Sequence, residues 1–62
     1  MARAESRREM VHRHIRRQED LIVRQRQLIE KLAAAGDSTR LAGQVLESME
    51  STLALLEQIN QT

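Results

Sequence analysis

The 62-residue sequence contains no cysteine, no proline and no aromatic side chain, and it has only two glycines. Without cysteine, neither a disulfide nor a thiolate metal site can stabilise so short a chain. The absence of proline favours long, uninterrupted helices, and no alternating run rich in valine, tyrosine or phenylalanine predicts a strand. The sequence therefore predicts an all-α protein with at most one small domain.

Long hydrophobic runs are also missing, since no apolar segment approaches the roughly 20 residues of a membrane span. The basic N-terminus is not followed by an apolar segment, so it lacks the pattern of a secretory signal. We therefore expect a soluble, cytoplasmic protein that does not bind membranes.

Residues suited to catalysis or metal binding do not cluster. His12 and His14 are the only imidazoles, and on a helix they point about 200° apart, so they cannot chelate one metal. The adjacent carboxylates Glu19 and Asp20 face different directions. There is no glycine-rich phosphate loop, and a chain this small offers no pocket of catalytic size. We expect no enzymatic activity, no cofactor, no metal and no small-molecule substrate.

The first half of the sequence contains a long apolar stripe. Its residues recur in steps of four and three, with glutamine in two of the places, and a second row repeats every seven residues beside it. The stripe is Val11, Ile15, Gln18, Ile22, Gln25, Ile29 and Leu32, and the second row is His14, Leu21, Leu28 and Ala35. This spacing predicts an amphipathic helix that ends near residue 35.

A short turn follows, at residues 36–38. Gly36 is suited to the left-handed conformation just beyond a helix end, and Asp37 or Ser38 can cap the next helix. So short a connection predicts two antiparallel helices, that is, a helical hairpin over residues 10–62. Residues 1–9 are polar, and we expect them to form an overhang with nothing to hold its end in place.

The second predicted helix covers residues 39–60 and carries a broad apolar band. The band is Leu41, Ala42, Val45, Leu46, Met49, Thr52, Leu53, Leu55, Leu56 and Ile59. Folding at the turn predicts the pairs Leu32–Ala42, Ile29–Val45, Gln25–Met49, Ile22–Thr52, Gln18–Leu56 and Ile15–Ile59. In this register the second helix ends opposite residue 12, and residues before about 10 project beyond it.

The apolar band of the second helix occupies four of the seven heptad positions, which is wider than one neighbouring helix covers. We therefore expect two hairpins to join as a two-fold dimer with a four-helix bundle. A different protein that supplies the missing helices is the alternative. The residues expected in the core or the oligomer interface are Val11, Ile15, Gln18, Leu21, Ile22, Gln25, Leu28, Ile29, Leu32, Leu41, Val45, Leu46, Met49, Leu53, Leu56 and Ile59.

Gln18 and Gln25 occupy positions that are otherwise apolar, and two interpretations are open. Either the glutamines lie at the boundary of the stripe with their amides in water, or they form hydrogen bonds across the dimer and fix its register.

Charge is distributed unevenly along the chain. Residues 1–31 carry nine cations against five acids, whereas residues 32–62 carry one cation against four acids. Five cations gather on the outer side of the first helix: Arg13, Arg16, Arg17, Arg24 and Lys31. They could contact nucleic-acid phosphates. A solvated helix face is the ordinary explanation, because acids interrupt this side and no aromatic residue can stack on a base.

Residues 12–58 resemble a group of short helical-hairpin proteins, found mostly in alphaproteobacteria. The matching residues are His14, Ile15, Arg17, Gln18, Leu21, Ile22, Leu32, Gly36, Ala42, Leu46 and Leu53. The Asp-Thr that follows the glycine in the family is approximated here by Asp37-Ser38-Thr39. The resemblance implies a helical hairpin and transfers no activity or site residue.

The sequence thus predicts a non-catalytic interaction or structural protein that self-associates. The alternatives are a small regulator that binds nucleic acid through the first helix and a helical subunit that docks on another protein.

Overall fold

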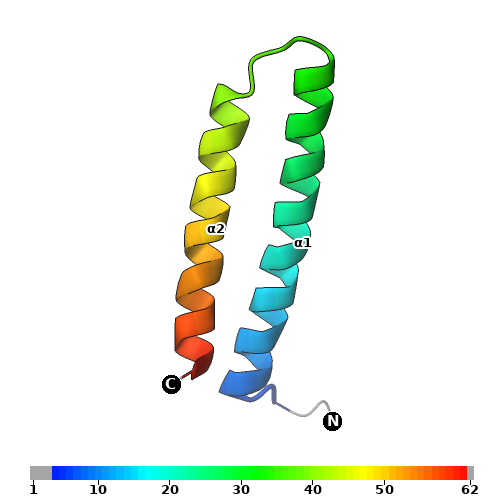
Figure 1. Ribbon diagram of the computed structural model, residues 1–62. Helices are drawn as coiled ribbons and strands as arrows, with labels where there is room; N and C mark the ends of the chain where they lie inside the picture. The colour runs from blue at the N-terminus through cyan, green and yellow to red at the C-terminus, as the bar shows by residue number, and fades with distance from the viewer. Residues whose placement is uncertain (1–3, 62) are drawn as a thin grey trace.

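The computed structural model describes residues 4–61, which form two helices, α1 (Arg7–Ala34) and α2 (Arg40–Gln61). The helices lie side by side and antiparallel, so that the start of α1 and the end of α2 meet at the end opposite the turn (Figure 1). No strand occurs among the described residues. The predicted all-α helical hairpin is confirmed.

The start of α1 is held by local contacts, which differs from what we expected for residues 4–9, while residues 1–3 of the predicted overhang lie outside the described residues. Ser6 has extended backbone angles, and its hydroxyl accepts a hydrogen bond from the Glu9 N–H at 3.1 Å. The same hydroxyl donates to Glu9 Oε1 at 3.1 Å. Glu5 accepts two hydrogen bonds from Arg13, each 2.9 Å long. Although these residues have no apolar face, their polar side chains bind one another and the first turns of the helix.

The end of α1 is closed by Gly36, as the sequence predicts. Gly36 has a φ of 77°, in the left-handed region. Its N–H donates to the Ala33 carbonyl at 3.1 Å, and the Asp37 N–H donates to the Leu32 carbonyl at 2.9 Å. These two bonds form a Schellman motif, which satisfies carbonyls that the helix end leaves free. The Ser38 hydroxyl then accepts from the Arg40 N–H at 3.4 Å, so Ser38 supplies the acceptor predicted for Asp37 or Ser38.

The two helices meet along a line of contact that we call the seam. Ile22 is the only buried residue between residues 4 and 61, with 5% of its surface exposed, and the other seam residues are half-buried. The α1 side of the seam is Val11, Ile15, Gln18, Ile22, Gln25, Ile29 and Leu32, and the α2 side is Ala42, Leu46, Met49, Leu53 and Leu56. A core this thin leaves most apolar side chains of the hairpin in contact with solvent.

The register between the helices differs from the predicted one. Gln25 donates to the carbonyl of Ala42 and Gln18 to the carbonyl of Met49, each seven residues earlier in α2 than the predicted partner. The connection covers residues 35–39 rather than 36–38, and it lets α2 start below the end of α1 (Figure 1). α2 therefore extends further toward the start of α1, where Ile59 and Asn60 share a hollow with Arg7 and Arg8. The predicted end of α2 opposite residue 12 was wrong.

Candidate interaction surface

The two sides of the seam can be described with heptad letters. Seam residues occupy positions a and d in both helices, for example Ile22 and Leu53 at a, and Gln25 and Met49 at d. Position e comes four residues after a, g comes directly before a, and c comes directly before d. In an antiparallel pair the two e rows flank one side of the seam and the two g rows flank the other.

The e side of the hairpin is polar. Arg26 and Glu50, both at e, form an ion pair of 3.4 Å between exposed side chains. Glu19 and Glu57 lie at the same heptad position and line the same shallow groove. Exposed ion pairs of this kind remain solvated and contribute little to stability, so the e side needs no further partner to cover it.

The g side of the hairpin is apolar. Leucine, valine and isoleucine fill most of its g positions, and two further leucines stand at neighbouring c positions of α2. We call this set the apolar face, and it consists of Leu21, Leu28, Leu41, Val45, Leu55 and Ile59. All six side chains are exposed, Leu41 to 74% and Leu55 to 61%. Single exposed apolar residues are ordinary in proteins, but a contiguous set on one side of a molecule is typical of an interaction surface.

The structure divides the residues predicted for the core and the oligomer interface into two groups. One group forms the seam, including Leu46 and Leu53, which were in none of the pairs predicted between the two helices. The other group is exposed on the apolar face, including Val45 and Ile59, which the predicted register had placed opposite Ile29 and Ile15. That placement was wrong, because the seam of α2 uses the row that begins at Ala42 and Leu46.

Both glutamines of α1 form hydrogen bonds within the hairpin. Gln18 Nε2 donates to the Met49 carbonyl at 3.1 Å, and Gln25 Nε2 donates to the Ala42 carbonyl at 2.8 Å. Neither interpretation drawn from the sequence described this arrangement, because the acceptors are backbone carbonyls of the same chain. A carbonyl oxygen has two lone pairs, so it can accept from a glutamine and still take part in the helix.

The cations predicted to contact nucleic acid do not form one surface. Arg13 is held by Glu5 near the start of α1. Its hydrogen bonds lower the pKa of the Glu5 carboxyl below the usual value, and the carboxylate raises the pKa of Arg13. Arg16 lines a shallow hollow beside Arg13. The remaining three share position c on the edge of α1 next to the apolar face, and we call Arg17, Arg24 and Lys31 the cation row.

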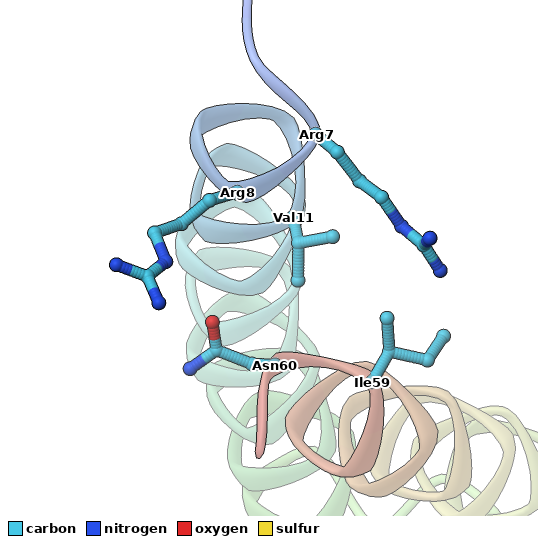
Figure 2. A pocket seen from close by; sticks show the side chains of 5 residues that line it. All are labelled: Arg7, Arg8, Val11, Ile59 and Asn60. Carbon is cyan, nitrogen blue, oxygen red and sulfur yellow. The ribbon is translucent and has the colours of Figure 1, made fainter. Parts of the chain in front are cut away.

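The open end of the hairpin has a hollow of about 310 Å³ between the two helices. Val11 and Ile59 form its apolar part, with Asn60 beside them, and Arg7 and Arg8 extend to opposite sides (Figure 2). The two guanidinium groups therefore do not converge on one point. This geometry does not form a site for a single anion.

Two features at the start of α1 were not among those predicted from the sequence. The sequence Ser6-Arg7-Arg8-Glu9 has the S-x-x-E pattern of a capping box, which places a helix start at Arg7. The Glu5–Arg13 pair has no comparable signal, because a spacing of eight residues is not a helical neighbour relation and requires the extended backbone at Ser6.

No helix of the described chain has the length and apolar character needed to cross a membrane, and no group of three metal-ligating side chains occurs among residues 4–61. In comparisons with known proteins, no family model, curated protein or solved structure matches this chain.

Proposed function

We propose that this chain is a non-catalytic interaction protein whose hairpins self-associate as a dimer through the apolar face. The observation that carries the proposal is the one-sided distribution of exposed apolar residues: the g side of the seam carries Leu21, Leu28 and Val45, while the e side carries the Arg26–Glu50 ion pair. Burying such a face against a second copy gives a four-helix bundle.

The exposed area of the chain supports the same proposal. The chain has an accessible surface of 5348 Å², whereas a compact protein of 7.2 kDa exposes about 4,100 Å². The excess of roughly 1,200 Å² is more than the roughly 800 Å² that each partner buries in a standard protein–protein interface. The excess is therefore large enough to be accounted for by an interface of ordinary size with a second copy.

Sedimentation equilibrium of the purified chain tests the proposal. We expect twice the chain mass of 7.2 kDa, and we expect Leu28→Lys to return the mass to one chain, because it places a charge at the centre of the apolar face. Val23→Lys is the matched control, since Val23 is 52% exposed but lies outside the apolar face. A one-chain mass for the parent protein with full helix content would contradict self-association and favour a different partner.

Binding of nucleic acid is the competing function. The observation in its favour is that Arg16, Arg17, Arg24 and Lys31 form no ion pair within residues 4–61. Retention of labelled RNA or DNA at about 0.15 M salt, lost steeply as salt rises, would support that function in place of ours.

A further inference from the structure

The cation row and the apolar face together determine which helix of a second copy fits against α1. This inference rests on the proposed self-association and concerns the arrangement of the two copies. At 3.6 residues per turn, the g row lies about 90° around the helix from the centre of the seam. In a four-helix bundle this is the direction of the neighbour from the other hairpin, and the c row lies about 40° beyond it.

Two symmetric arrangements bury the g side of both copies. With the turns at opposite ends of the bundle, α1 packs against α1 of the partner and α2 against α2. With both turns at the same end, α1 packs against α2 of the partner. In either case the c row of one helix borders the c row of its new neighbour.

Packing α1 against α1 would bring like charges together. The two cation rows would run side by side in opposite directions, so that Arg17 of one copy would lie beside the partner's Arg24. α1 carries eight cations against four acids, a net charge of +4, so the two helices repel each other as wholes as well. Like charges in register across an interface are a common means of excluding an arrangement.

Packing α1 against α2 has no such conflict. α2 carries one cation against three acids, a net charge of −2, so it attracts α1. The c row of α2 is Leu41, Ser48 and Leu55, and it holds no charge. The arginine and lysine stems of the cation row can lie over the two leucines while their charged ends stay in water. In this arrangement the row covers Leu41 and Leu55, the most exposed large apolar side chains among residues 4–61.

We propose that the partner of this surface is a second copy placed with its turn at the same end, so that the cation row of α1 covers Leu41 and Leu55 of the partner's α2. The cation row then determines which helix of the partner packs against α1, while the apolar face supplies the buried contact. This role requires no phosphate ligand.

A spin label on Asp37→Cys in the turn tests the arrangement by measuring the distance between the two labels of a dimer. The chain has no other cysteine, so each copy carries one label. Turns at the same end place the labels within about 30 Å, because the bundle is about two helix diameters across. Turns at opposite ends place them about 40 Å apart or more, because the 28 residues of α1 span about 42 Å.

The result separates this inference from the proposed function. A two-chain mass with a short distance supports both. A two-chain mass with a long distance overturns the arrangement and leaves self-association intact, whereas a one-chain mass overturns both.

Charge reversal at Arg24 gives a second test, because the arrangement of the two copies determines whether the dissociation constant of the dimer rises or falls. With the turns at the same end, Arg24→Glu faces the acidic helix and weakens the dimer by about two- to fivefold, the usual size for an exposed charge. With the turns at opposite ends, the new glutamate lies beside the partner's Arg17 and tightens the dimer, which would overturn the proposal. Arg16→Glu is the matched control, because Arg16 points away from both neighbouring helices and we expect its dissociation constant to stay at the parent value. Helix content reports that both variants fold.

Discussion

At the scale of single residues, Gln18 and Gln25 fix how the two helices are aligned. Leucine or isoleucine contacts tolerate a shift of one helix along the other, because dispersion and burial have no direction. A hydrogen bond from a side-chain amide to one particular carbonyl is lost when one helix shifts along the other. Each such bond has a net worth of about 1 kcal/mol, which is a large fraction of the stability of so thin a core.

Replacing both glutamines with leucine should raise the stability of the hairpin and at the same time allow more than one register between its helices. The variant Gln18→Leu/Gln25→Leu should unfold at a higher denaturant concentration, because apolar burial replaces two amides and no carbonyl loses its helix bond. It should also populate more than one register, which would be seen as additional amide signals in a ¹H–¹⁵N spectrum. Gln27→Leu, on the exposed side of α1, is the control and should add none. One set of signals from the double variant would contradict the role in alignment.

Glu5 gives the start of α1 a dependence on pH. Its carboxylate accepts two hydrogen bonds from Arg13, and these lower its pKa below the ordinary carboxyl value. A lowered pKa in the folded chain means that the pair stabilises the helix start above the ordinary carboxyl range. This contribution is lost as the pH falls through the lowered pKa.

We therefore expect the first turn of α1 to fray at acid pH before the centre of the helix does. Carbon-13 chemical shifts of the Glu5 carboxyl would follow its protonation, and those of the backbone of residues 7–10 would follow the fraying. We expect both to change over the same pH range. Arg13→Gln should return the pKa of Glu5 to its ordinary range. An unchanged pKa in that variant would show that another group is responsible.

At the scale of the elements, the two glycines have opposite roles, and alanine should distinguish them. Gly36 has a φ of 77°, so Gly36→Ala forces a left-handed conformation that costs about 1–2 kcal/mol. Gly43 lies inside α2 with nothing within 4 Å of an added Cβ atom, so Gly43→Ala should stabilise the hairpin by about 1 kcal/mol. Urea denaturation of both variants measures the difference. Equal effects of the two substitutions would contradict the assignment of the turn.

The elements also show how far the sequence predicts this fold. In α1 only one stripe recurs in steps of four and three, so its side of the seam follows directly from the spacing between Val11 and Leu32. α2 has several apolar rows, and nothing in the sequence distinguishes the row of Leu46 and Leu53 from that of Val45 and Ile59. The length of the connection and the two glutamine bonds decide between them. Both are properties of the folded hairpin, and the predicted register was wrong for that reason.

At the scale of the whole molecule, the two sides of the seam differ in polarity, and only the apolar side is suited to burial against another helix. The e side carries the Arg26–Glu50 ion pair, and the g side carries exposed leucine and valine side chains. Polar edges on one side and an apolar face on the other favour one added layer of helices, because a second layer would have to bury charge. This sidedness favours a closed dimer over an open assembly.

If the apolar face is buried against a second copy, association stabilises the folded hairpin, and the melting temperature depends on chain concentration. A hundredfold increase in concentration favours the dimer by about 2.7 kcal/mol, which corresponds to a rise of about 10 °C for two chains of this length. Circular dichroism melts over that range measure the rise. Leu28→Lys should melt at a lower temperature that does not change with concentration, while Val23→Lys should keep the slope of the parent chain. A parent melting temperature that is independent of concentration would show that the lone hairpin is stable, and the apolar face would then need another explanation.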